Sequence, residues 1–126
     1  YTDRDEARAE KANGSWGDVP AAELERELDE HLVAQPNGRV GWRISIPAMM
    51  SYWSELTRPA SLPRTGTPTT LVRAMHTSPP YATDELIATL EAGLGSSFTL
   101  LEWDCDHMVP LAKPVETAAV IRDRMG

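Results

Sequence analysis

FTLLEWDCDHMVPLAKPVE, the stretch from Phe98 to Glu116, is the part of the sequence from which the fold can be worked out. Phe98–Trp103 follows the turn signal Gly95-Ser96-Ser97 and carries the aromatic and apolar residues of a buried strand. Pro114 then opens a helix, because a proline at the first helical position loses no hydrogen bond. His107 lies between these two elements. A histidine on a short loop just past a strand is held firmly and stays accessible, as a general base requires.

Three other interpretations of this stretch are possible. His107 could be an ordinary loop histidine bonded to the backbone. Asp104, Cys105, Asp106 and His107 could form a metal cluster, but adjacent residues rarely converge on one ion and zinc sites draw on separated pairs, so we reject a metal. Cys105 is also a weak candidate for a nucleophile, because a Cys–His pair meets in space rather than two residues apart on one loop.

Moving upstream, the segment Thr69–Ala74 is rich in β-branched residues and predicts a second strand. The loop Met75–Pro80 follows it, and Thr83 can cap a helix over residues 84–94. With the helix over 114–125, the order becomes strand, helix, strand, helix. This order predicts two adjacent parallel strands with both helices packed against them. Two parallel strands do not form an independent sheet, so further strands must come from elsewhere.

The N-terminal part of the chain is predicted to be helical. Thr2–Asn13 is rich in Ala, Glu, Arg and Lys and predicts a solvated helix. A second helix begins near Asp18 as N-cap, with Pro20 in its first turn. Its apolar stripe should be buried against residues 40–56 or a partner chain; the stripe consists of Leu24, Leu28 and Leu32.

The middle of the chain contains a predicted strand, a predicted helix and a connector. Arg39–Ile46 alternates apolar and polar residues, as a short strand does. Pro47–Leu56 predicts a helix dense in Met and aromatic residues, whose apolar face is either core or the lining of a substrate channel. Arg58–Pro68 holds three prolines and a glycine, so we interpret it as a connector.

Composition and charge exclude several classes of function. The chain has 126 residues, 41% of them hydrophobic and 25% charged, as expected for one small globular domain. Its net charge of −7 argues against nucleic acid and against anionic membrane surfaces as partners. We expect no membrane span, and the single cysteine fits a reducing, cytoplasmic location.

From about Val40 onward, the order of elements resembles the C-terminal half of the α/β-hydrolase fold. It runs from the end of a cap through the penultimate strand, a helix, the last strand, a histidine loop and a closing helix. The resemblance implies an α/β fold, incomplete without a partner polypeptide. Residues 1–57 would be a helical cap or lid, residues 58–68 a connector, and residues 69–126 the end of the hydrolase core.

The sequence departs from the pattern of this family in three places. The nucleophile elbow G-x-S-x-G is absent from the chain. The loop Met75–Pro80 has no carboxylate, although the family usually carries its triad acid there. Asp84 is the nearest candidate, and it can equally be a first-turn acid of a helix; an earlier strand outside the chain is another source. Asp106 precedes His107 where the family often has glycine.

The resemblance implies a serine-type hydrolase of esters or related acyl bonds, in which His107 is the general base and Asp84 the candidate acid. A serine on the missing N-terminal part, encoded separately or cleaved, would attack a small-molecule substrate, and no cofactor is implied. The start at Tyr1 fits a mature product, a trimmed chain or a fragment, and we expect the chain alone to be inactive. Two alternatives are a non-catalytic α/β module, degenerate or with a binding role, and a helical interaction domain with no sheet.

Overall fold

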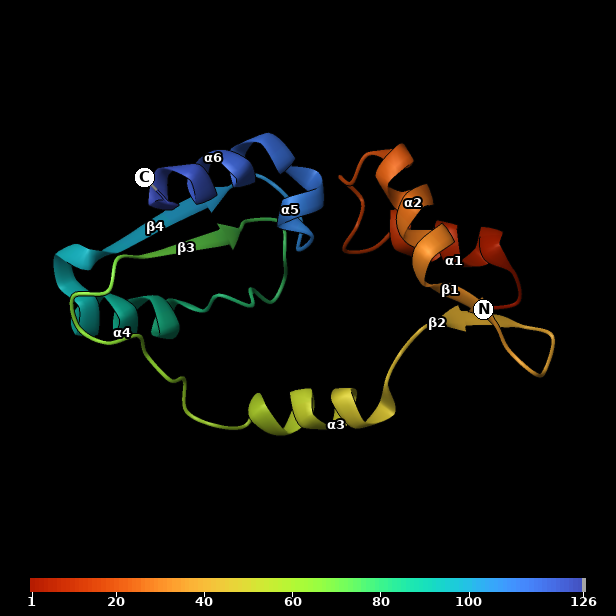
Figure 1. Cartoon of the computed structure of the whole chain (residues 1–126), viewed down its shortest axis with the longest axis horizontal. Helices are drawn as coiled ribbons and strands as arrows, with labels where there is room; N and C mark the ends of the chain where they lie inside the picture. Colours follow the sequence, from red (N-terminus) through yellow and green to blue (C-terminus); the bar gives the residue numbers. More distant parts are fainter. Residues whose placement is uncertain (126) are drawn as a thin grey trace. The chain divides into compact units, whose positions relative to one another are not determined.

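The computed structural model of the chain describes residues 1–125 and divides into two compact units, Tyr1–Ala60 and the part from Ser61 onward (Figure 1). The first unit contains two helices, a small hairpin and a third helix. The second unit contains a parallel pair of strands with helices on it.

The sheet of the second unit consists of β3 (Thr69–Ala74) and β4 (Phe98–Trp103), which are parallel. Their register runs from Thr69 opposite Phe98 to Ala74 opposite Trp103. The connection between them passes through α4 (Asp84–Leu94), and β4 is followed by α6 (Pro114–Met125). Figure 1 shows α4 and α6 on opposite sides of the sheet. Both strands, their parallel direction and both helices agree with the sequence prediction.

Local chemistry sets the ends of α4, as predicted. The hydroxyl of Thr83 accepts a hydrogen bond from the backbone N–H of Leu86 at 3.2 Å, which is the expected N-cap. Gly95 follows the helix with a φ of 51°, a conformation that a side chain would disfavour. Between these ends, α4 buries one apolar stripe, formed by Ile87, Leu90 and Leu94. This stripe is the main hydrophobic contribution of the helix to the core of the second unit.

One helical turn of the second unit was not predicted. α5 (Val109–Ala112) occupies the segment that the sequence indicated as a short loop before Pro114. A four-residue helix is too short to show a hydrophobic period, so the pattern in the sequence could not reveal it. The turn begins two residues after His107 and therefore limits the histidine loop to a few residues.

In the first unit, α1 (Arg4–Ala12) and α2 (Ala21–His31) are followed by the antiparallel strands β1 (Leu32–Ala34) and β2 (Val40–Trp42). The strands are joined by a tight turn in which Gly38 has a φ of 78°. The two expected helices are present, but the residue at the N-cap of α2 is Pro20 rather than Asp18.

The hairpin corrects two sequence predictions. The stripe expected to continue to Leu32 ends with Leu24 and Leu28, which are buried, because Leu32 already belongs to β1 and is half-buried. The strand expected over Arg39–Ile46 is only three residues long, since β1 offers three residues to pair with. Ile46, at the end of that segment, is instead the first residue of the next helix and is exposed.

The third helix of this unit, α3 (Ile46–Glu55), lies where the sequence predicted a helix and buries none of its residues. Its exposed apolar side chains include Met50, Tyr52 and Trp53. The interpretation of this face as core is therefore wrong for the part of the chain that the structure describes. No helix among residues 1–125 is long and apolar enough to cross a membrane.

Ion pairs join α1 to α2. The guanidinium groups of Arg4 and Arg8 both contact the carboxylate of Glu25, and Arg4 also contacts Asp29 at 2.7 Å. The hydrogen bonds from Arg8 and then Arg4 lower the pKa of Glu25 from 4.5 to about 2. Because the pKa is lower in the folded state, these contacts stabilise the folded chain fully above about pH 4.5 and lose this effect as the pH falls towards about 2.

We therefore expect Glu25→Gln to reduce the acid sensitivity of the first unit. The urea concentration at the midpoint of unfolding should fall further between about pH 6 and about pH 3 in the wild-type chain than in the variant. Only the wild type has this carboxylate to protonate. Urea titrations at several pH values measure the difference. Glu91→Gln, at an exposed glutamate of α4, is the matched control. An equal fall of the urea midpoint on acidification in Glu25→Gln and in the wild type would contradict the prediction.

Candidate active site at the carboxyl edge of the sheet

The loops that leave β3 and β4 stay paired beyond the ends of the strands. The backbone N–H of Met75 donates to the carbonyl of Trp103 at 2.9 Å, and that of His76 donates to the carbonyl of Cys105 at 3.1 Å. The carboxyl ends of parallel strands are where open α/β folds place their binding sites. The backbone on either side of this edge is thus held firmly, and side chains from both loops come together there.

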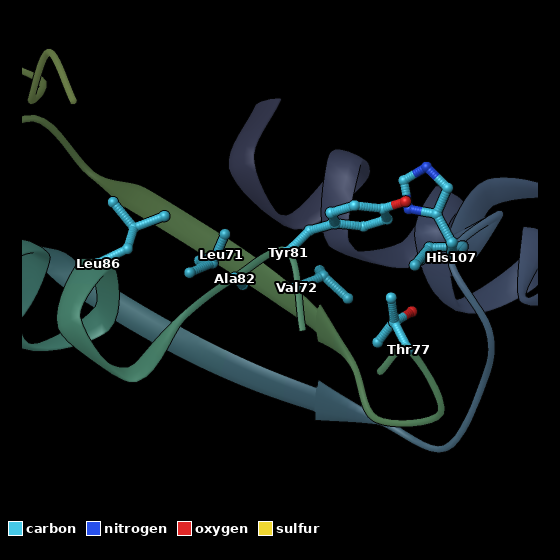
Figure 2. Close-up of a pocket in the computed structure, with 9 residues that line it drawn as sticks. Leu71, Val72, Thr77, Tyr81, Ala82, Leu86 and His107 are labelled. Atoms are coloured by element: carbon cyan, nitrogen blue, oxygen red, sulfur yellow. The ribbon is translucent and has the colours of Figure 1, made fainter. Parts of the chain in front are cut away.

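His107 lies on the loop between β4 and α5, two residues before α5 begins. Its ring packs edge to face against the ring of Tyr81, with centroids 4.5 Å apart and planes inclined by 62° (Figure 2). Tyr81 comes from the loop between β3 and α4, so two loops that are distant in the sequence form this contact. The predicted base is therefore at the carboxyl edge of the sheet with its ring accessible.

An open pocket of about 350 Å³ adjoins the ring of His107. It is lined by residues of β3, of the loop before α4, of α4 and of the segment after β4, among them Leu71, Val72, Leu86 and Val109 (Figure 2). Neighbouring residues of a strand point to opposite faces of the sheet. Since both Leu71 and Val72 line it, the pocket wraps around the edge of β3 that is not paired with β4.

The pocket contains one polar group that needs a partner. The hydroxyl of Thr77 is buried and has no hydrogen-bonding partner among residues 1–125. A buried hydroxyl without a partner costs free energy, so such groups normally contact protein or water. The pocket is therefore a largely apolar groove whose lining includes the buried, unpaired hydroxyl of Thr77.

The structure adds a histidine–carboxylate pair that the sequence prediction missed. The ring Nε2 of His76 lies 2.6 Å from Oδ1 of Asp104, and both side chains are well exposed, at 49% and 91%. The register of the sheet could have indicated it, because Ala74 lies opposite Trp103 and the residues just beyond them must be neighbours. An exposed pair of this kind contributes little to stability, but it is a second candidate for a base with an orienting acid.

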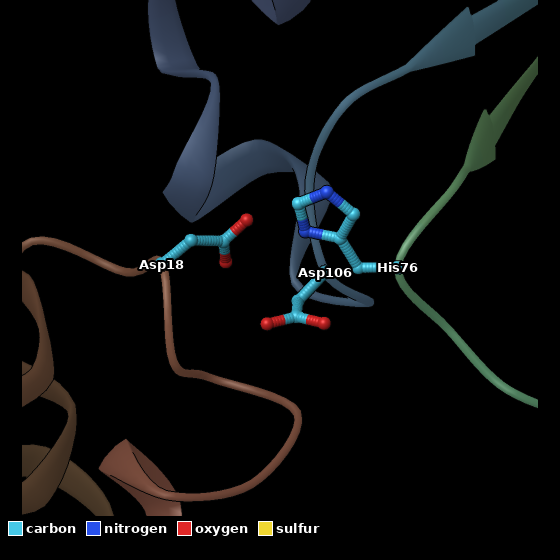
Figure 3. Close-up of side chains that lie close together, drawn as sticks. All are labelled: Asp18, His76 and Asp106. Carbon is cyan, nitrogen blue, oxygen red and sulfur yellow. The ribbon is translucent and has the colours of Figure 1, made fainter.

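A metal is a weaker interpretation of the groups around His76. Figure 3 draws His76 and Asp106, from the loops after β3 and β4, whose ligand atoms lie within 4.8 Å of each other; Asp18, also drawn, belongs to the first unit. The 2.6 Å between His76 and Asp104 is a hydrogen-bond distance. Two ligands of one zinc ion, each about 2 Å from it, normally lie farther apart than this.

The structure does not bring Asp84 to His107 within the described chain. Asp84 is the first residue of α4, its side chain is 87% exposed, and its carboxylate lies 2.8 Å from Nη1 of Arg73 on β3. This ion pair ties the start of α4 to the sheet, as expected of a first-turn acid. Cys105, by contrast, is fully buried, which does not suit a nucleophile that must reach a substrate.

Comparison with known proteins finds a similar protein. The sequence is 63% identical, over all 126 residues, to a protein named Lipase LipV from Mycobacterium tuberculosis (strain ATCC 25618 / H37Rv). The chain spans about half the length (48%) of this curated relative. No family model matches the sequence, and no solved structure matches it.

Proposed function

We propose that the chain is the C-terminal part of a serine-type α/β hydrolase that cleaves an ester or a related acyl bond, and that His107 is its general base. The likeness to a lipase of about twice its length supports a hydrolytic function and a missing part. The observation that carries the proposal is the place of His107: on the loop after β4, at the carboxyl edge of a parallel sheet, beside an open groove.

The reaction follows the chemistry of an activated serine. A serine hydroxyl on the missing part attacks the ester carbonyl while His107 accepts its proton. The protonated imidazole then gives this proton to the departing alkoxide oxygen, leaving an acyl-enzyme. Water, deprotonated by the same ring, hydrolyses the acyl-enzyme and regenerates the serine. Within this cycle the chain supplies the base, and the nucleophile comes from outside it.

A carboxylate must orient the ring of His107, and two sources are compatible with the proposal. Asp84 is the acid nearest to the position that the resemblance implies, and its pairing with Arg73 would have to change for it to serve. The missing part is the other source. The variant Asp84→Asn in the complete protein distinguishes these two sources. If Asp84 is the triad acid, kcat falls by orders of magnitude; if the acid is on the missing part, only a surface ion pair is lost and kcat does not fall in this way.

The missing part is proposed to pair with the free edge of β3. A parallel sheet of two strands leaves unpaired N–H and C=O groups on that edge, and soluble proteins avoid such exposed edges. The groove lined by Leu71 and Val72 surrounds the same edge, and the buried hydroxyl of Thr77 in its lining has no partner among residues 1–125. His107 lies at the end of this groove, so a strand that pairs with β3 would bring its own carboxyl end towards the ring.

The N-terminal segment, residues 1–57, is proposed to be the cap, joined by the connector 58–68 to the core. Its helix α3 exposes Met and aromatic side chains along its length. Adaptable apolar side chains of this kind suit the wall of a channel for an ester with an apolar acyl group.

A fluorophosphonate probe, which reacts covalently with activated serines, tests the proposal. The complete protein should be labelled at a serine outside these 126 residues, while the chain alone, despite its own serines, should remain unlabelled. Labelling should be strongly reduced in His107→Ala, because the serine then lacks its base. A folded complete protein that takes up no label would favour the alternative, a non-catalytic α/β module.

A further inference from the structure

The ring of His107 has an aromatic neighbour, Tyr81. Within the described residues, 1–125, it makes an aromatic contact with Tyr81 and no side-chain hydrogen bond. A histidine ring can rotate about two side-chain bonds, and a base on a loop needs its ring held within hydrogen-bonding reach of the group that it deprotonates. The contact with Tyr81, at 4.5 Å between centroids, provides such a restraint.

The position of Tyr81 is not explained by burial. Its side chain belongs to the large apolar side chains that remain exposed, with 67% of the residue accessible. A core aromatic would hide most of its surface to gain the hydrophobic contribution, and Tyr81 does not. Its ring instead lies against the ring of His107, edge to face (Figure 2).

The backbone around Tyr81 is restrained on both sides. Pro79 and Pro80 precede it, and each proline ring fixes its own φ angle. Two residues later, Thr83 caps α4 through its hydroxyl, which anchors the end of the loop. The tyrosine is therefore presented from a short segment that has little freedom to move away from His107.

We infer that Tyr81 is a positioning residue for His107: its ring limits the rotation of the imidazole and keeps it directed towards the groove along β3. The inference rests on the proposed function, since it concerns the orientation of the proposed base. Aromatic contacts of this geometry are favourable beyond the area they bury, and the effect depends on the ring rather than on the hydroxyl. Phenylalanine at position 81 should therefore still position His107, and alanine should not.

The test uses the complete protein and compares wild type with Tyr81→Phe and Tyr81→Ala. Turnover of a short-chain nitrophenyl ester should fall about 10- to 100-fold in kcat for Tyr81→Ala, with KM within about twofold, because a misplaced base slows chemistry more than binding. Tyr81→Phe should keep kcat within about twofold of wild type. Val115→Ala, at an exposed residue of α6, is the matched control and should match the wild type in both constants.

Proton NMR of the His107 ring provides a second readout that does not require turnover. The ring current of Tyr81 should displace the chemical shifts of the carbon-bound protons of His107, assigned with His107→Ala. The displacement should persist in Tyr81→Phe and disappear in Tyr81→Ala.

The possible outcomes separate this inference from the proposed function. If His107→Ala is inactive but Tyr81→Ala retains the wild-type kcat, the positioning role is overturned and the function stands. A raised KM with unchanged kcat in Tyr81→Ala also overturns it, because Tyr81 would then contact substrate. Equal losses in Tyr81→Phe and Tyr81→Ala overturn it in favour of the hydroxyl. Full activity in His107→Ala removes the premise, and with it both proposals.

Discussion

In the complete protein, His107→Ala is expected to lower kcat for a short-chain nitrophenyl ester by about 10³-fold or more, which amounts to loss of measurable turnover. The melting temperature should change by less than about 2 °C, since His107 lies on a loop and buries little surface. The physical reason for the loss is that a serine hydroxyl is a poor nucleophile unless a base takes its proton during the attack. Thermal unfolding and ester turnover, measured on the same preparations, test both halves of the expectation.

The other two histidines of the chain provide matched controls. His31→Ala, at the end of α2, should leave turnover unchanged. His76→Ala is the sharper comparison, because His76 is also at the carboxyl edge of the sheet and has a carboxylate 2.6 Å away. If His76→Ala loses turnover and His107→Ala keeps it, the base has been assigned to the wrong histidine. Full turnover in all three variants would exclude a histidine of this chain from catalysis.

The chain by itself is expected to show no ester turnover, and co-expression with the remaining part should restore it. The reason is that the proposed function draws both the nucleophile and the strand next to β3 from outside these residues. Assembly should also protect the backbone amides of β3 from hydrogen exchange, because their free edge becomes paired. Activity assays and exchange rates, with and without the remaining part, measure the two effects.

A charged substitution in the groove gives this second prediction a specific test. Ala82→Arg places a long charged side chain in the groove beside β3 and should prevent both the restored turnover and the protection of β3. Val115→Arg adds the same charge at an exposed position of α6, and this variant should keep both the restored turnover and the protection of β3. Normal restoration in Ala82→Arg would mean that the missing part docks elsewhere. Turnover by the chain alone would show that its nucleophile lies within these 126 residues.

Much of the second unit could be predicted from the sequence, because strong local signals mark its elements. β3, α4, β4 and α6 were all expected where they occur, with the two strands parallel. Thr83 as a cap, Gly95 as a stop and Pro114 as the first helical residue act through neighbouring backbone groups, and such effects can be recognised in a single short stretch. The place of His107 just after a strand was visible for the same reason.

The first unit shows where local signals are overridden. The leucine spacing favoured a helix that continues through Leu32, yet the helix ends at His31. Leu32 and Val33 instead pair with Trp42 and Gly41 in the hairpin. Backbone pairing with a segment several residues away decided the end of the helix. Helix periodicity carries no information about such strand pairing.

The contacts of the candidate site depend on tertiary structure alone. Arg73 with Asp84, His76 with Asp104 and Tyr81 with His107 each join residues from different elements, and none is marked by spacing in the sequence. The residue types of the site could be recognised one by one, but their partners could not. The last two pairs follow from the parallel register of β3 and β4, which places the loops after the two strands side by side at one edge of the sheet.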